Sequence, residues 1–293
     1  MKKASLFIFF VVLVSIAIGA LLFLSTGNFS FINNENSKKT TNAKTISLEN
    51  INEISIKNSS VDIKVVSEDR TDAKINLINS KNSISTSTKD NKVSITVAPS
   101  SNNIFFFNFT PNVRLEITLP KSYLNKLSLE SSSGNMSLNN VSLSDLTCAL
   151  SSGNLSIKDL TITNLKCTSS SGTLNGTAIN TVDSIFSSSS GNILLKKFTG
   201  NIETTTSSGD TKIGYEKFNN TLNAHTSSGN VRLTLPKNSE FNLDALSNSG
   251  NINCSFPLDI KNSYKKKTLQ GTVKNDTNKI YLRTSSGNIN ITH

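Results

Sequence analysis

Acid–base chemistry in this chain would have to come from two histidines and a few carboxylates. His225 and His293 are the only histidines among the 293 residues, and imidazole is the side chain that most often acts as a general base near neutral pH. The carboxylates in the middle of the chain are Asp145, Asp159, Asp183 and Asp210. We interpret these four as lying at different places in the repeat described below, without the recurring carboxylate pair that polysaccharide-cleaving enzymes use. The sequence therefore predicts no catalytic residue and no cofactor.

Three cysteines offer thiol chemistry. Cys148 and Cys167 hold the same position in consecutive repeats, so we expect them to stack about 4.8 Å apart, which is compatible with a disulfide. Alternatively they are two free thiols that behave as small apolar core residues, because stacked parallel side chains are poorly aimed for the bond. Cys254 is also expected to face inward, without a partner. None of the three stands near a histidine at metal-ligand spacing, so no metal site is predicted.

Lysine is the most concentrated source of charge. The formal net charge is +10, and the +2 of Lys2 and Lys3 taken from it leaves +8 for the rest of the chain. The densest cluster is Lys261, Lys265, Lys266 and Lys267. This cluster is either a contact for an anionic surface or a solvated charge run. Teichoic acids, phospholipid surfaces and polyanionic glycans are the expected partners. Nucleic acid is not, because the chain contains no recognised binding motif.

A short phrase, Ser-Ser-Gly-Asn or a close variant, organises the chain that carries these residues. Its glycines are Gly134, Gly153, Gly172, Gly191, Gly209, Gly229, Gly250 and Gly287, at intervals of 19, 19, 19, 18, 20, 21 and 37 residues. A fixed period near 20 residues is typical of a solenoid. The last interval has the length of about two repeats with one phrase missing.

Apolar residues alternate with Ser, Thr, Asn and Lys on both sides of each glycine, as around Gly153, where Leu146, Cys148, Leu155 and Ile157 point one way. A period of two indicates strands with one face inward. We expect the phrase to be the tight corner of each rung, with glycine supplying positive φ. Stacked rungs would place Asn135, Asn154 and Asn192 above one another as a hydrogen-bonded amide ladder. The prediction is an all-β, parallel β-helix-like solenoid of ~19-residue rungs.

The first residues predict a membrane segment. After Lys2 and Lys3, residues 4–24 are uncharged and mostly apolar, which is long enough to span a bilayer as a helix. The lysines favour a cytoplasmic N-terminus and export of the rest. Residues 1–24 are therefore a single-pass anchor, or a signal peptide whose cleavage would leave the protein secreted. Residues 25–44 are rich in Asn, Ser, Thr and Lys, which indicates a flexible linker.

Residues 45–293 form the predicted solenoid domain. Within it, residues 45–122 alternate without the glycine phrase and are interpreted as an irregular capping half, and residues 123–293 carry the regular repeats. The aromatic run Ile104-Phe105-Phe106-Phe107 is either an exposed contact patch or part of the cap over the open end of the core. Residues 261–278 are an insertion that breaks the period, and Ile280 to Ile291 supply a last rung.

The order of these features resembles a known family. Leu119-Pro120-Lys121, the serial Ser-Gly-Asn turns, Leu235-Pro236-Lys237, a basic insertion with Gly271 and a closing rung ending Ser286-Gly287-Asn288-Ile289 are similar to the bacterial "putative adhesin" domain of the toastrack group of β-solenoids. That group includes LiaG-like proteins of cell-envelope stress operons. The resemblance covers roughly residues 45–293. It implies a fold and no site residues.

These observations favour a membrane-anchored, extracytoplasmic scaffold without enzymatic activity, adhesin-like or associated with envelope stress. A regulatory subunit that associates with other membrane proteins in a stress-sensing complex is the alternative, and a polysaccharide-active enzyme is a third.

Overall fold

The computed structural model describes residues 41–293 except 81, 99–112, 265–266 and 276. The chain divides into two compact units, Met1–Lys38 and Lys39–His293, and the first lies outside the described residues. The predicted anchor over residues 1–24 and the phenylalanine run at 104–107 therefore also lie outside them. In the part of the chain that is described, no helix is long and apolar enough to cross a bilayer.

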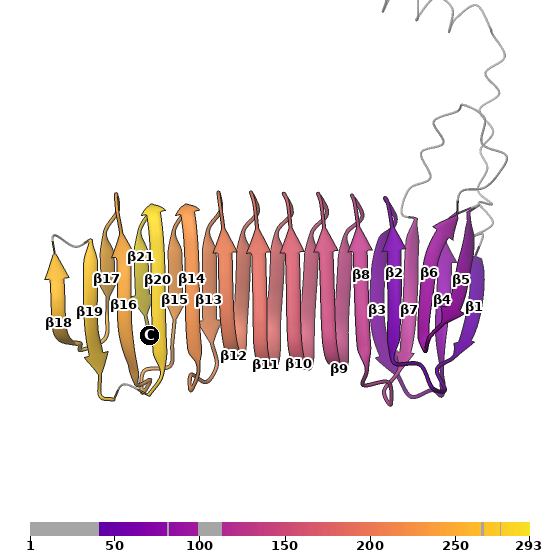
Figure 1. The fold of residues 1–293 in the computed structure, drawn as a ribbon, viewed down its shortest axis with the longest axis horizontal. Helices are drawn as coiled ribbons and strands as arrows, with labels where there is room; N and C mark the ends of the chain where they lie inside the picture. The colour runs from indigo at the N-terminus through magenta and orange to yellow at the C-terminus, as the bar shows by residue number, and fades with distance from the viewer. Residues whose placement is uncertain (1–40, 81, 99–112, 265–266, 276) are drawn as a thin grey trace, which may run out of the picture. The chain divides into compact units, whose positions relative to one another are not determined.

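The described chain is all-β, as predicted, and its strands stack side by side in one continuous series (Figure 1). The first half contains β1 (Thr41–Ser47), β2 (Glu53–Asn58), β3 (Asp62–Glu68), β4 (Asp72–Ile78), β5 (Ser83–Lys89), β6 (Lys92–Ala98), β7 (Arg114–Pro120), β8 (Lys126–Ser131), β9 (Met136–Leu150), β10 (Leu155–Ser169) and β11 (Leu174–Ser188). The second half contains β12 (Ile193–Thr206), β13 (Thr211–Tyr215), β14 (Thr221–Ser228), β15 (Val231–Thr234), β16 (Phe241–Ser247), β17 (Ile252–Cys254), β18 (Asp259–Tyr264), β19 (Thr268–Val273), β20 (Lys279–Ser286) and β21 (Ile289–Thr292).

The rungs β9, β10 and β11 show why the period is 19. Each pairs in parallel with the next so that Leu155 lies beside both Met136 and Leu174, 19 residues away on either side. Within β9, the burial of alternate residues is interrupted at Asn139–Asn140 and again at Ser144–Asp145. These interruptions divide the rung into three straight segments, and the glycine phrase makes the third corner. The predicted solenoid of ~19-residue rungs is confirmed.

Both ends of the stack depart from the parallel pattern. At the N-terminal end β4 pairs antiparallel with β1 and with β7, and β5 pairs antiparallel with β6. At the C-terminal end β19 pairs antiparallel with β16 and with β18. The predicted linker over residues 25–44 overlaps β1, because Thr41 to Lys44 pair with Ile78 to Ile75. Strand structure thus starts before the predicted domain boundary at residue 45.

The last rung in the sequence is not the last rung in space. β20 pairs in parallel with β14 on one side and with β16 on the other, and β21 lies in the same way between β15 and β17. The intervening residues form the β18–β19 hairpin at the end of the stack (Figure 1). The interval of 37 residues therefore contains a terminal hairpin followed by a return of the chain into the stack.

The phrase glycines form one column, but the predicted reason for them is wrong. None has positive φ; among the glycines of the described residues only Gly200 does, at 129°. Each phrase glycine instead lies against a backbone carbonyl one rung away, which belongs to Val61 for Gly134 and to another phrase glycine for the rest. A Cβ on Gly172, for example, would stand 1.7 Å from the Gly153 carbonyl oxygen. Left-handed φ occurs at another corner, where Asn140, Asp159, Ala178 and Lys197 have φ of 54°, 53°, 54° and 51°.

A single hydrophobic core runs through the stack from Ile51 to Ile291. Its largest fully buried side chains are Phe186, Phe198 and Phe241. In the C-terminal half, edge-to-face aromatic contacts link successive rungs, with Phe198 and Tyr215 ring centroids 5.3 Å apart and Phe241 and Phe256 5.2 Å apart. Such columns bury apolar surface and add ring–ring attraction. The core thereby holds the outward surface on a rigid frame.

Candidate functional site

The two histidines lie on the surface, and neither forms an ion pair with a carboxylate that the structure describes. His225 is exposed in β14, as its place in the alternation predicts. His293 contacts Ser255 through Nδ1 at 2.9 Å and packs on the Phe256 ring at 5.4 Å. In the described part of the chain, no group of three or more His, Cys, Asp or Glu side chains could hold a metal ion.

Two of the predicted carboxylates share a column, which corrects their placement at different rung positions. Asp145 and Asp183 both pair with Asn164, because 38 residues is two rungs of 19. Asn164 donates to Asp145 Oδ1 at 3.0 Å, and Asn201 donates to Asp183 Oδ1 at 3.0 Å. The Ser144 hydroxyl is the main cause that lowers the pKa of Asp145. Each carboxylate thus accepts a hydrogen bond in an amide ladder, and Asn164 separates the two along the column.

The predicted amide ladder forms at the glycine corner in two parts, because Thr173 stands between Asn154 and Asn192 in the column. Asn135 Oδ1 accepts from the Asn154 backbone N–H at 3.0 Å, and Asn154 Oδ1 accepts from that of Thr173 at 2.9 Å. Asn192 Oδ1 accepts from the backbone of Asp210 at 2.8 Å. Hydrogen bonds of this kind, from backbone to side chain, satisfy the backbone N–H groups at the corner that do not take part in the strand pairing between rungs.

Asp210 continues this ladder and joins it to an ion pair. Its Oδ1 accepts from the Asn230 backbone at 2.9 Å, and its Oδ2 lies 2.7 Å from Arg232 Nη1. Burial alone would raise the pKa of Asp210, but the hydrogen bonds from Asn230 and Arg232 outweigh it and lower the pKa. Asp210 is therefore a structural anion.

Cys148 and Cys167 are buried neighbours in the core, paired in register on β9 and β10. Both are free thiols, as is the half-buried Cys254. Burial raises the pKa of Cys167 well above its usual value, and the neighbouring Cys148 adds to the effect. A thiol held in its neutral form is a poor nucleophile, so of the two alternatives left open by the sequence the structure shows the apolar core pair.

The predicted lysine cluster lies at the terminal hairpin. Lys261 is exposed in β18 and Lys267 is exposed in the turn before β19, whereas Lys265 and Lys266 lie outside the described residues. Among the strands that the structure describes, β18 pairs with β19 alone. All six of its residues are exposed, including Ile260 and Tyr264 at 57% and 61%. The hairpin therefore presents an unpaired strand edge together with positive charge.

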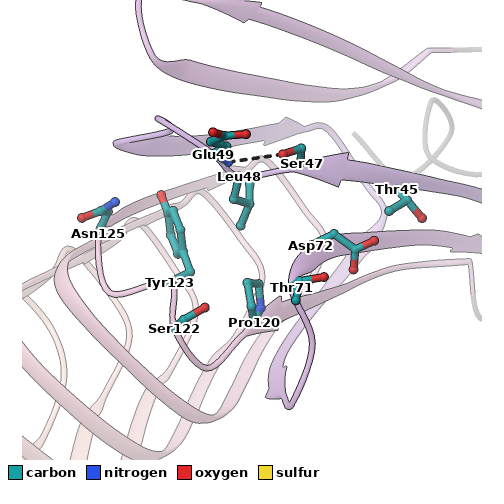
Figure 2. A pocket seen from close by; sticks show the side chains of 10 residues that line it. All are labelled: Thr45, Ser47, Leu48, Glu49, Thr71, Asp72, Pro120, Ser122, Tyr123 and Asn125. Atoms are coloured by element: carbon teal, nitrogen blue, oxygen red, sulfur yellow. Dashed lines mark hydrogen bonds between the residues drawn. The ribbon is translucent and has the colours of Figure 1, made fainter.

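An open pocket of about 640 Å³ lies near the opposite end of the described chain (Figure 2). Glu49 and Asp72 line it with hydroxyl side chains and Tyr123. Two of its polar groups are already engaged: Arg70 lies 2.5 Å from Asp72 Oδ1, and the Tyr123 hydroxyl donates to the Lys126 carbonyl at 2.7 Å. Burial raises the pKa of Tyr123 far above the physiological range. This constellation stabilises the capping strands and provides no nucleophile with an adjacent base.

A second basic surface was not found from the sequence. The first straight segment of each rung, in β9 to β12 and then β13 and β15, forms a face that we call the cationic face. Its outward cations are Lys158, Lys196, Lys212 and Arg232. Its remaining outward positions in these strands are Ser, Asn, Thr, Gly214 and the half-buried Leu194. The signal was present, because these four cations stand five or three residues after a phrase glycine.

The charges of the cationic face are only partly neutralised. Arg232 is bound to Asp210, and Lys158 lies 3.9 Å from Asp159 at the rim. Lys196 and Lys212 are exposed and form no ion pair with any residue that the structure describes. The third straight segment differs, because Lys57 lies 2.7 Å from Glu130 and Arg283 lies 2.5 Å from Asp244. Surplus positive charge thus gathers on one side of the rungs.

The rung register, the glycine column and the two antiparallel ends define a capped β-solenoid. A family model described as "Toastrack DUF4097" matches residues 51–292, and the chain belongs to this family. The resemblance noted in the sequence is therefore confirmed. No curated protein matches the chain.

Solved structures share the fold at low sequence identity. A "putative adhesin" from Bacteroides fragilis is 17% identical with a TM-score of 0.50, covering 87% of this chain and 98% of its own. A "putative cell adhesion protein" from Clostridium sporogenes is 13% identical with a TM-score of 0.29, covering 87% and 99%. A "putative lipid binding protein" from Parabacteroides distasonis is 16% identical with a TM-score of 0.42, covering 88% and 97%. At these identities the similarity concerns the fold alone.

Proposed function

We propose that this protein is a non-enzymatic scaffold of the bacterial cell envelope, held by residues 1–24 with its solenoid on the extracytoplasmic side, where it attaches to anionic envelope components. The observation that carries the proposal is the surplus of exposed cations on a rigid, otherwise uncharged polar surface, exemplified by Lys196 and Lys212. An adhesin-like role is consistent with the description of the similar Bacteroides fragilis structure as a "putative adhesin".

The chemistry of the other groups supports a binding role over catalysis. Asp145, Asp183 and Asp210 are committed to ladders and ion pairs, and the buried Cys148 and Cys167 are core residues. Carboxylates used in this way hold corners together. The exposed lysines, in contrast, attract polyanions and headgroups at long range through a mechanism that salt screens.

Sedimentation with isolated cell walls tests attachment. The full-length chain, purified in a neutral detergent, should co-sediment with the walls at low ionic strength and be released as the salt concentration rises, because exposed charges are screened within about 10 Å at 0.1 M salt. An absence of binding at every salt concentration would contradict the proposed function.

Protease treatment of intact spheroplasts tests the location. A solenoid on the outer side should be cut by added protease without lysis, and the chain should fractionate with membranes if residues 1–24 are retained. Protection of the solenoid until lysis would refute the extracytoplasmic placement.

The edge strand β18 favours a second candidate, a regulatory subunit that docks on another membrane protein. Its free side can accept a partner strand, as in β-augmentation, and Ile260 and Tyr264 lie exposed beside that edge. Cross-linking from position 262 in β18 in intact membranes should then capture one defined protein. Capture that is unchanged when Ile260 is replaced by Asp would count against this candidate.

A further inference from the structure

The cationic face is the part of the described surface where charge is most one-sided. Among the described outward positions of its first segments in β9, β10, β11, β12, β13 and β15, four are cationic and none is a carboxylate. Asp62, Asp159 and Asp210 lie beside it, at the corners that bound the face. A ligand on this face therefore meets positive charge and neutral hydrogen-bonding groups.

We propose that the cationic face binds a linear polymer that carries phosphodiester groups, with the polymer running along the stacking direction. This inference rests on the proposed attachment to the envelope and assigns to it a site and a ligand class. Ammonium and guanidinium groups form charge-assisted hydrogen bonds with phosphate oxygens. The neighbouring Ser, Thr and Asn side chains can bond the hydroxyl groups of such a polymer.

The rung register fixes the order of the cations along the stack. Lys158 and Lys196 lie in one column with Thr177 between them, so they are two rungs apart, or about 9.6 Å. Lys212 lies one strand further, beside Leu194, and Arg232 pairs directly with Lys212 on the strand after that. The four cations thus succeed one another over four rung steps, about 19 Å. A chain with regularly spaced phosphates can engage them one after another.

The surface composition favours a polymer over a lipid bilayer. Membrane-surface binding normally adds apolar side chains that insert at the acyl boundary to the electrostatic attraction. The exposed large apolar residues of the described chain all lie outside the first straight segments, and they are Leu124, Val182, Ile185, Ile260, Tyr264 and Tyr281. Among the outward side chains of the cationic face, the aliphatic Leu194 is half-buried. Flat strands with small polar side chains also leave room for an extended chain to lie in contact.

A binding experiment with matched variants tests the site. The full-length chain in neutral detergent is immobilised through an N-terminal tag and exposed to soluble poly(glycerol phosphate), to glycerol 3-phosphate, and to mixed micelles containing phosphatidylglycerol. The test variant is Lys196→Gln with Lys212→Gln. The control, Lys74→Gln with Lys166→Gln, removes the same charge from exposed strand positions outside the cationic face. Neither pair touches the core, so both variants should fold.

We expect the polymer to bind much more tightly than glycerol 3-phosphate, because linked phosphates engage several cations at once. The test variant should weaken polymer binding about 10- to 30-fold and reduce its salt dependence, and the control should leave both nearly unchanged.

Each contrary result has a distinct meaning. If both variants lose polymer binding equally, or if neither loses it, the cationic face is overturned as the site. If the wild type binds micelles but not the polymer, and the test variant loses micelle binding, the face is assigned to a membrane and the polymer is overturned as its ligand. Wild-type binding to cell walls that survives in the test variant would leave the proposed function standing and remove this inference. Failure of the wild type to bind cell walls at all would instead remove the proposed function.

Discussion

Glycine in the repeated phrase serves close approach between rungs. At Gly153, Gly172 and Gly191 a methyl group would stand 2.1, 1.7 and 1.9 Å from the carbonyl oxygen of the adjacent glycine. These oxygens belong to backbone and cannot rotate away, so a Cβ would push two rungs apart.

Gly172→Ala should therefore lower the free energy of unfolding by about 3 kcal/mol or more, at the upper end of overpacking costs. Gly214→Ala is the control, since the nearest atom to its new Cβ would be the Leu195 carbonyl oxygen at 3.7 Å. Urea denaturation followed by circular dichroism compares the two. Equal midpoints for both variants would contradict this account of the phrase.

Asp244 illustrates a second residue-scale property, the acid sensitivity of the ladders. Burial alone would raise its pKa, but hydrogen bonds from Arg283 and Gln270 lower it below the ordinary value of 3.8. A carboxyl with a lower pKa in the folded state stabilises the fold above the unfolded-state pKa, and this contribution is lost as the pH falls through the folded pKa.

We expect Asp244→Asn to reduce the dependence of stability on pH below about pH 4. The measurement is the urea midpoint between pH 6 and pH 3 for the wild type, Asp244→Asn and the control Asp259→Asn, which changes an exposed residue of β18. If Asp244→Asn loses stability more steeply in acid than the wild type does, the expected direction of the pH effect of Asp244 is wrong.

Among the elements, the returning segment β20–β21 has the greatest effect on neighbouring strands. It supplies hydrogen-bonding partners to β14 and β16 at once, and to β15 and β17. Without it, four strands would each have an unpaired side, and Leu222 and Leu243 would lose Ile280, which lies between them.

Deletion of residues 279–293 should therefore abolish amide-exchange protection in β14 to β17 while β9 to β11 remain protected. Deletion of His293 alone leaves both strands intact and serves as the control. If protection of β14 and β16 is unchanged in the longer deletion, these two strands can pair with each other without β20 between them.

The hairpin strand β18 belongs to the same scale. Its exposed Lys261 and the irregular register between Ile260 and Asn262 are devices that discourage pairing of sheet edges. We expect Lys261→Thr to promote concentration-dependent self-association, measured by light scattering after gel filtration. Lys166→Thr removes the same charge from β10, which is paired on both sides, and should remain monodisperse to the same degree as the wild type.

At the scale of the whole molecule, each rung contacts its neighbours, so a local defect should remain local. Phe186 is buried between Cys167 and Thr204 on adjacent strands. Phe186→Ala should cost about 3–5 kcal/mol through the cavity it creates, and exchange protection should fall most in β10 to β12 and least in β4 to β7. Uniform loss along all strands would indicate global cooperativity instead.

The sequence predicted the rung, because alternation and the glycine phrase are local signals that recur every 19 residues. It did not predict the insertion of β20 between β14 and β16, since alternation is the same whichever rung a strand pairs with. The cationic face was missed for a related reason. Lys196 and Lys212 stand at different distances from their glycines, and only the register of β12 with β13 shows that they share a face.

The place of the final rung also has a consequence during synthesis. Residues 279–293 leave the ribosome and, in an exported chain, cross the membrane after all four strands that they join. Until they arrive, the space between β14 and β16 stays vacant, so the sheet cannot become continuous while the polypeptide is being made. A stalled or clipped product would display two open sheet edges, a feature by which quality-control proteases could tell it from a finished molecule.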